Sequence, residues 1–319
     1  MLFFDSWDGA SNFSGSTEQH KLEAYLGPTS VVFSSHQAAI TAVFEVLGSR
    51  STDIPVILPI TIAPDTLSAV LRAGASPLLL DIEADTLQID PTLLAEVLGE
   101  LPTAMVVFNR PGGQPVTANL LELTKDIVTV VDTNLPPSIA VGEDCVGSFT
   151  VFDLSPIIGS GGVVHHKYSQ QISELKMIRN GVLGLAANLN ETLCTLAYTR
   201  LHEDPKLTTR KLKQAQAAMY YLEKLDDVSS VPFVASPEWP YFILKVENAD
   251  KVIAHLHSYD ILAAKPVFPL HLLPHISRRW TEKPEYPVAE LMYKTLVALP
   301  THRGVLGREF EIISKLQEV

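Results

Sequence analysis

The chain has 319 residues, of which 46% are hydrophobic and 19% are charged, and its formal net charge is −12. This acidic balance argues against nucleic-acid binding, because phosphate contacts need clustered Lys and Arg. The longest apolar runs, such as residues 55–64, are about half as long as a membrane span, so we expect no membrane insertion. The two cysteines, Cys145 and Cys194, are too few for a disulfide framework, and residues 1–8 lack the basic start of a signal peptide, so we expect a cytoplasmic protein.

From Ser30 onward, short apolar runs alternate with segments of helical spacing. The runs predict strands at 30–35, 55–60, 76–82, 103–109, 127–132, 149–154 and 161–166. The segments between them predict helices at 36–48, 63–74, 90–101, 117–126 and 169–181. This alternation is typical of βαβ units and an α/β fold with a mainly parallel central sheet flanked by helices.

Ligands of such sheets bind at the carboxyl ends of the strands. The expected strand ends fall at 34–35, 59–61, Asp81, 109–113, 132–134 and 152–162.

After about Arg200 the pattern changes to a second, smaller α+β unit. We expect a strand at 239–248 and helices at 249–260, 287–300 and 307–319, after a helix that ends near Leu225. The predicted domains are therefore residues 1–200 and residues 201–319.

Two groups of residues could bind a ligand. Ser34, Ser35, His36 and Gln37 join a strand to a helix N-terminus, where free N–H groups favour an anion, although an ordinary N-cap serine would look the same. Asp132 ends the 127–132 strand and could face a protonated ring nitrogen or a sugar hydroxyl, or simply cap nearby amides.

The histidines and cysteines do not predict a metal site. His165 and His166 are adjacent on a strand and face opposite sides, and His271 and His275 have Pro274 between them and no accompanying HExxH glutamate.

Residues 152–162, "FDLSPIIGSGG", form a loop that is rich in glycine. Its glycines would let another group approach the backbone closely, yet the loop contains no lysine, histidine or cysteine. For the "GSGG" at 159–162 within this loop, the simplest alternative is a tight turn between two strands.

Several motifs occur in the order found in one family. Residues 18–27 read "EQHKLEAYLG" and residues 112–115 read "GGQP", followed by "FPLHLLP" at 268–274 and "LPTH" at 299–302. With the segment from residue 59 to residue 90, they resemble the DegT/StrS group of sugar aminotransferases, which are pyridoxal phosphate (PLP) enzymes of fold type I. The resemblance implies a dimeric, two-domain protein of that fold.

The family's Schiff-base lysine has no counterpart at the matching position. Counting back from the glycines, that position holds Leu154 or, with one deletion, Ser155, and neither can form an imine.

Other positions that contact PLP in the family also differ. The resemblance places Ala63 at the stacking aromatic, Pro136 near the glutamine and Asn188 at an arginine that crosses the dimer interface. The phosphate loop reads Ser35, His36 and Gln37, and the pyridine-binding aspartate is either Asp132 or replaced by Thr133.

We therefore expect no covalent cofactor and no catalytic residue. The vestigial pocket would be formed by Ser34, Ser35, His36, Gln37, Ala63, Asp132, Thr133, Ser155 and Asn188. The leading hypothesis is a non-transaminating homodimer that serves as a binding or partner subunit in surface-polysaccharide biosynthesis. A heterodimer with an active paralogue is the alternative assembly.

Two alternatives remain open. One is an active PLP enzyme in which Lys167, Lys176 or Lys265 replaces the missing lysine. The other is a nucleotide-sugar sensor that uses the old cleft.

Overall fold

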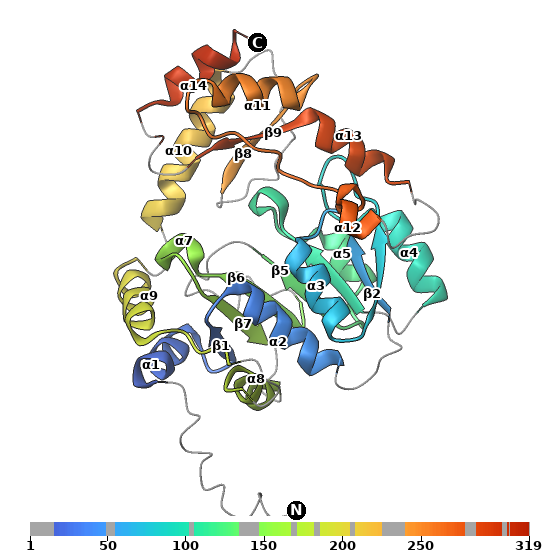
Figure 1. Cartoon of the computed structure of the whole chain (residues 1–319), viewed down its shortest axis with the longest axis vertical. Helices are drawn as coiled ribbons and strands as arrows, with labels where there is room; N and C mark the ends of the chain where they lie inside the picture. The colour runs from blue at the N-terminus through green and yellow to red at the C-terminus, as the bar shows by residue number, and fades with distance from the viewer. Residues whose placement is uncertain are drawn as a thin grey trace, which may run out of the picture. The chain divides into compact units, whose positions relative to one another are not determined.

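The computed structural model describes most of the chain (Figure 1). The described residues are 16–48, 55–101, 105–133, 147–166, 171–181, 186–204, 208–224, 240–277, 285–301, 305 and 307–318. Contacts group the chain into two compact units. The first unit is Met1–Asp53, Ser68–Ala75 and Val130–Lys206, and the second unit is Ile54–Leu67, Ser76–Thr129 and Leu207–Val319.

A seven-stranded sheet has the order β1-β7-β6-β5-β4-β2-β3. Its strands are β1 (Ser30–Phe33), β2 (Pro55–Pro59), β3 (Ser76–Leu80), β4 (Met105–Asn109), β5 (Thr129–Asp132), β6 (Phe149–Asp153) and β7 (Gly162–His166). β2 is parallel to β3 and β4, and β5 is parallel to β6, whereas β7 is antiparallel to both β1 and β6. The apolar runs that form β1, β4 and β6 have almost wholly buried side chains, as a sheet covered on both faces requires, whereas β3, at the end of the strand order, is largely half-buried.

The helices of the first unit pack against β1 and against one another. The helices are α1 (Thr17–Leu26), α2 (His36–Gly48), α7 (Ser155–Ile158), α8 (Ile172–Arg179) and α9 (Glu191–Glu203). Ser16 and Asn190 are the N-caps of α1 and α9. α1 packs against α9, and the Tyr25 hydroxyl donates a hydrogen bond to the Leu201 carbonyl oxygen at 3.0 Å (Figure 1).

A buried ion pair connects three elements of this unit. The Glu23 carboxylate on α1 accepts a hydrogen bond from the Val32 amide of β1 at 2.9 Å and pairs with the Arg179 guanidinium of α8. Both charged side chains are almost fully buried, and a buried charge is tolerated only when it is paired.

The second unit combines β2, β3 and β4 with a two-stranded antiparallel sheet. The small sheet pairs β8 (Tyr241–Lys245) with β9 (Leu296–Pro300). The other elements that begin in this unit are α3 (Pro64–Arg72), α4 (Pro91–Glu100), η2 (Pro111–Gly113), α5 (Ala118–Leu123), α10 (Thr208–Lys224), α11 (Ala249–His257), η4 (Leu270–Leu272), α12 (Pro274–Ser277), α13 (Pro287–Thr295) and α14 (Glu309–Leu316). α10, α11 and α14 pack around β8 and β9 over a core that includes Tyr221, Phe242 and Leu299 (Figure 1).

One predicted helix is wrong in its last five residues. The 287–300 segment is helical only as α13, and Leu296–Pro300 form β9. The reason is a non-local pairing, since Leu296 to Pro300 run antiparallel to Lys245 to Tyr241, and local spacing cannot reveal it. The predicted domain boundary near residue 200 stays a prediction.

Candidate functional site

The turn from β1 into α2 is an ordinary helix start. Ser35 is its N-cap, because the Ser35 Oγ accepts a hydrogen bond from the Ala38 amide at 3.1 Å. The Ser34 amide donates to the Ala187 carbonyl at 2.8 Å, and Gln37 is exposed. The amides of Ser34 and Ala38, which could have bound an anion, therefore already donate hydrogen bonds within the chain.

His36 and Asp132 form a pair in the first unit. The His36 Nε2 lies 2.9 Å from the Asp132 Oδ1, and the Asp132 side chain is buried. Thr133 is fully buried and donates its amide to the Val151 carbonyl at 3.0 Å. The sequence identified both members of the pair as separate candidates, but their separation of almost a hundred residues hid the contact.

The glycine-rich loop at 159–162 packs on the same turn. Ser35 and Gly161 form a parallel bridge, and the Ser160 Oγ donates to the Ser34 carbonyl at 2.7 Å. A Cβ at Gly162 would lie 2.8 Å from both the His36 Cα and the Ser35 carbonyl oxygen. The close approach predicted from the glycines is therefore an approach to the chain's own helix start. A short helix, α7, separates β6 from the glycines at 159–162, so these residues turn the chain from a helix into β7 rather than from one strand into the next.

The two residues at the lysine position lie in different environments. Leu154 is fully buried, and its amide donates to the Gly161 carbonyl at 3.0 Å. Ser155 is exposed, and its Oγ donates to the Asp153 Oδ2 at 2.6 Å. Neither side chain can supply an amine to a carbonyl compound.

The remaining positions of the predicted pocket belong to different units or lie outside the described residues. Asn188 is exposed and follows Ala187, whose carbonyl oxygen binds the Ser34 amide. Ala63 belongs to the second unit, where it is exposed and its carbonyl oxygen accepts from the Thr66 amide at 3.0 Å. Pro136 lies outside the described residues.

Two of the three alternative lysines form ion pairs. The Lys176 Nζ lies 3.5 Å from the Glu23 Oε2. The Lys265 Nζ lies 2.8 Å from the Asp250 Oδ1 and 3.7 Å from the ring centroid of Tyr293. Lys167 is outside the described residues.

The cysteines and histidines have structural surroundings where they can be described. Burial raises the pKa of the Cys194 thiol to about 11, so it is a poor nucleophile at neutral pH; Cys145 lies outside the described residues. Burial, with a smaller effect of His166, lowers the pKa of His165. The His271 Nε2 lies 3.1 Å from the Glu290 Oε1. The described part of the chain contains no group of three or more His, Cys, Asp or Glu side chains placed to hold a metal ion.

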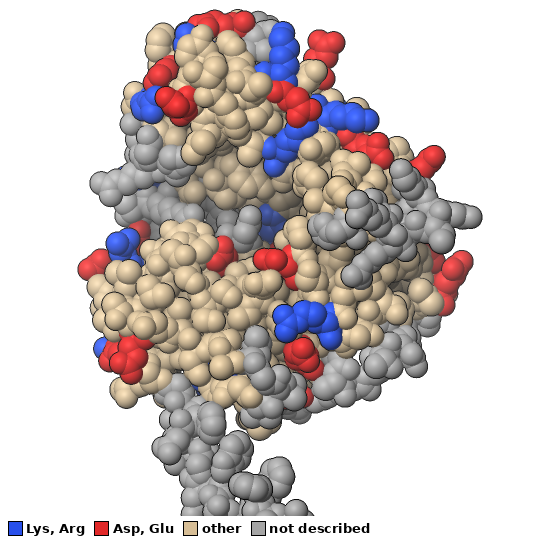
Figure 2. Space-filling model, viewed as in Figure 1, with Lys and Arg blue, Asp and Glu red and all other residues tan. Residues whose placement is uncertain are grey.

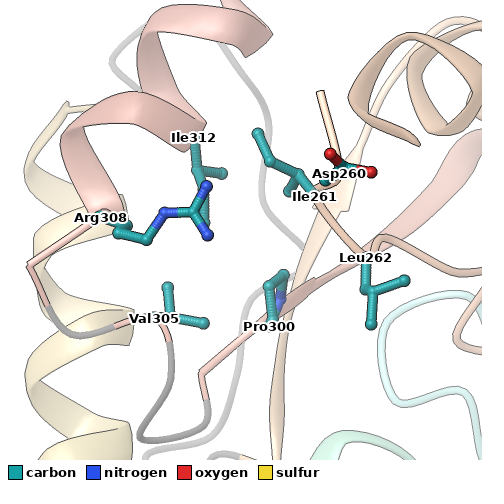
Figure 3. A pocket seen from close by; sticks show the side chains of 7 residues that line it. All are labelled: Asp260, Ile261, Leu262, Pro300, Val305, Arg308 and Ile312. Carbon is teal, nitrogen blue, oxygen red and sulfur yellow. The ribbon is translucent and has the colours of Figure 1, made fainter. Parts of the chain in front are cut away.

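A small cavity of about 100 Å³ lies in the second unit (Figure 3). Its apolar lining is formed by Ile261, Leu262, Pro300, Val305 and Ile312. Its two charged lining residues are Asp260 and Arg308, and the Arg308 guanidinium also binds the exposed Glu311 carboxylate at 2.9 Å. None of the residues that the sequence predicts for the cofactor pocket lines this cavity. The cavity therefore does not correspond to the predicted cofactor pocket.

Acidic and basic side chains are interspersed on the face shown in Figure 2 rather than gathered by sign. Across the residues that the structure describes, no helix has both the length and the apolar character needed to cross a membrane.

Comparison with known proteins identifies the family. The sequence model of the DegT/DnrJ/EryC1/StrS aminotransferase family matches residues 16–125 and 157–317. The chain belongs to this family. A curated relative, the erythromycin biosynthesis sensory transduction protein EryC1 of Saccharopolyspora erythraea, is 23% identical over 271 residues, which cover 77% of this chain and 73% of the relative.

Solved structures of sugar aminotransferases share the fold. The PMP form of the putative sugar aminotransferase Spr1654 from Streptococcus pneumoniae matches with a TM-score of 0.80 at 18% identity, covering 95% of this chain and 92% of that chain. Helicobacter pylori PseC, an aminotransferase of pseudoaminic acid biosynthesis, matches with a TM-score of 0.81 at 18% identity, covering 95% and 91%. The predicted family and the predicted α/β fold type I architecture, with its mostly parallel sheet, are confirmed.

The family match is interrupted at the site. Residues 126–156 fall outside the two matched ranges, and these residues include Asp132, Thr133, Leu154 and Ser155.

Proposed function

We propose that this chain is a sugar aminotransferase homologue that does not form an imine with PLP and does not catalyse transamination. It acts instead as a binding or partner subunit, linked to the biosynthesis of surface polysaccharides. The observation that carries the proposal is the lysine position, where a buried Leu154 is followed by an exposed Ser155 hydrogen-bonded to Asp153.

The pair formed by His36 and Asp132 supports the same conclusion. The resemblance implies that an aspartate at this position faces the protonated ring nitrogen of PLP. Here one carboxylate oxygen of Asp132 lies 2.9 Å from the His36 imidazole instead. Because Leu154 and Ser155 at the lysine position offer no amine, the described residues there do not fit a covalently bound PLP, and no reaction step is assigned to that cofactor.

The energetic consequence is large. General acid–base catalysis by a positioned side chain contributes about 10²–10⁴-fold to a rate, and covalent catalysis is lost in addition. In the family, one lysine acts both as the covalent nucleophile and as the general acid–base group. Its loss therefore removes both contributions to the rate of transamination at once.

Half-transamination tests the loss of activity. The purified chain is incubated with PLP and an excess of L-glutamate, and absorbance is followed for conversion of PLP to pyridoxamine phosphate. We expect the rate to equal that of PLP and glutamate without protein. A rate above this background that is proportional to protein concentration would contradict the proposal.

Co-expression tests the partner role. The chain carries an affinity tag and is expressed with an untagged, lysine-containing member of the same family. A stoichiometric complex after size exclusion is the expected result. Homodimers of the tagged chain alone, with the paralogue eluting separately, would contradict a partner role and leave a binding role for the homodimer.

A further inference from the structure

The small cavity of the second unit combines an apolar interior with two opposite charges (Figure 3). Its interior includes the buried side chains of Ile261, Val305 and Ile312. Its two charged lining residues, Asp260 and Arg308, are both exposed and therefore lie at its rim. A ligand that fits this cavity needs an apolar group for the interior and polar groups that meet both rim charges.

The volume of the cavity sets the size of the apolar group. An apolar cavity of about 150 Å³ holds one molecule of benzene, which has six carbon atoms. By the same ratio, this cavity of about 100 Å³ holds about four carbon atoms. A branched aliphatic group of the size of a leucine or isoleucine side chain fits this volume.

Asp260 lies in the turn that follows α11, and its backbone conformation is unusual. Its φ is 58°, and its amide donates to the His257 carbonyl at 3.1 Å. Leu87 and Asp260 are the non-glycine residues with a positive φ in the part of the chain that the structure describes. The turn thereby fixes a carboxylate beside Ile261 and Leu262, which also line the cavity.

The Arg308 guanidinium provides the opposite charge at the rim. Its hydrogen bonds with the described residues use two of its donors, since Nε and Nη2 donate to the Glu311 carboxylate at 2.9 Å and 3.2 Å. These bonds leave the Nη1 donors for a ligand. Figure 3 shows Arg308 and Asp260 on opposite sides of the cavity, with the guanidinium extending toward the space between them.

The two rim charges are close enough to interact. The pKa of Arg308 is raised, mainly by its hydrogen bond to Glu311 and by the charge of Glu311, and the charge of Asp260 contributes to the same rise. A ligand that carries only a carboxylate would face repulsion from Asp260 and Glu311. A ligand that carries only an amine would face repulsion from Arg308.

We propose that this cavity binds the free zwitterion of a branched-chain amino acid, L-leucine or L-isoleucine. The α-carboxylate accepts hydrogen bonds from Arg308, the α-ammonium group donates to Asp260, and the four-carbon side chain fills the apolar interior. The inference goes beyond the proposed function, because it uses no residue of the predicted cofactor pocket and holds whether or not the chain forms an imine with PLP.

Saturation-transfer difference NMR on the full-length protein tests the ligand. L-Leucine and L-isoleucine should receive saturation. Three molecules that each lack one part of leucine should bind at least about tenfold more weakly in titrations: L-alanine lacks the branched group, 4-methylpentanoate lacks the ammonium group and isopentylamine lacks the carboxylate. L-Glutamate should receive no saturation, because its charged side chain cannot enter an apolar cavity.

Two variants should change the affinity for L-leucine in opposite directions. Asp260→Asn removes the rim anion but keeps a residue that tolerates a positive φ, and it should weaken binding at least about tenfold. Glu311→Gln removes the competing partner of Arg308 and should tighten binding by up to about fivefold, as expected for an exposed ion pair. The matched control is Glu122→Gln, which breaks the exposed pair with Lys125 in α5 and should leave binding unchanged. Acidic residues with a merely structural role would not shift the affinity in opposite directions.

Three results would overturn the inference: no saturation of L-leucine or L-isoleucine, binding of 4-methylpentanoate or isopentylamine as tight as that of L-leucine, or unchanged binding by Asp260→Asn. Equal losses of affinity in Asp260→Asn and Glu311→Gln would also contradict it. None of these results bears on half-transamination, so failure here and failure of the proposed function can be told apart.

Discussion

Replacing Gly162 with alanine tests whether the glycine loop serves the chain's own packing. The added Cβ would lie 2.8 Å from the His36 Cα, 2.8 Å from the Ser35 carbonyl oxygen and 2.9 Å from the Ala39 Cβ. Two of these atoms are backbone and the third belongs to the first turns of α2, so no flexible side chain can move aside. The substitution must push β7 and the start of α2 apart.

Overpacking a well-packed site lowers the free energy of unfolding by about 1–3 kcal/mol. We expect a loss of about 3 kcal/mol for Gly162→Ala, because backbone atoms cannot move aside as a side chain can. Unfolding entropy is about 2.1 cal/mol/K per residue, which gives about 0.7 kcal/mol/K for 319 residues. The expected fall in Tm for Gly162→Ala is therefore about 4–5 °C, measured by circular dichroism on heating.

Gly99→Ala is the matched control. Gly99 lies in α4, and a Cβ there would meet nothing within 4 Å. Alanine is favoured over glycine inside a helix by about 0.5–1 kcal/mol, so the control should be as stable as the wild type or slightly more so. A Gly162→Ala protein that melts with the wild type would refute the packing argument and show that the glycine leaves room for something else.

Three further changes test other contacts. Arg179→Met leaves the buried Glu23 carboxylate without its guanidinium partner and should lower the free energy of unfolding by about 3–5 kcal/mol in urea titrations; a loss below about 1 kcal/mol would contradict a buried, coupled pair. Tyr241→Phe removes the acceptor of the Gly112 amide and should cost about 1–3 kcal/mol, whereas an unchanged urea midpoint would mean that the amide has another partner. Burial lowers the pKa of His165 below its ordinary value of 6.5, so the unfolded state takes up a proton first as the pH falls. The free energy of unfolding should therefore decline as the pH drops from 6.5 through the lowered pKa. The decline should be less steep in His165→Gln, and an equally steep decline in the variant and the wild type would contradict this role of His165.

Local sequence was sufficient for most of the fold. Residues 162–166 and 105–109 are short apolar runs between polar turns, and both became strands with mostly buried side chains. Residues 296–300 were harder, because they continue directly from a helix and become a strand only by pairing with residues 241–245. A partner that distant leaves no trace in local spacing.

The site was predictable in its parts but not in its contacts. The sequence singled out His36 and Asp132 separately, yet their 2.9 Å approach depends on the order of strands in the sheet. It also pointed to the strand ends at 59–61 and 109–113 without indicating that the Thr61 Oγ1 and the Asn109 Oδ1 are buried with no hydrogen-bond partner among the described residues. Burial of a single oxygen is a property of packing, which residue types alone do not specify.

The most direct test of the central claim is reductive trapping. The purified chain is mixed with one equivalent of PLP, scanned for a shifted visible band, reduced with borohydride and digested for mass spectrometry, with a lysine-containing family member treated in parallel. We predict a single trapped lysine in the family member and no stoichiometric adduct on any lysine of this chain. A shifted band with one lysine of this chain trapped near full occupancy would contradict the account and would identify that lysine as the one that replaces the missing residue at Leu154 or Ser155.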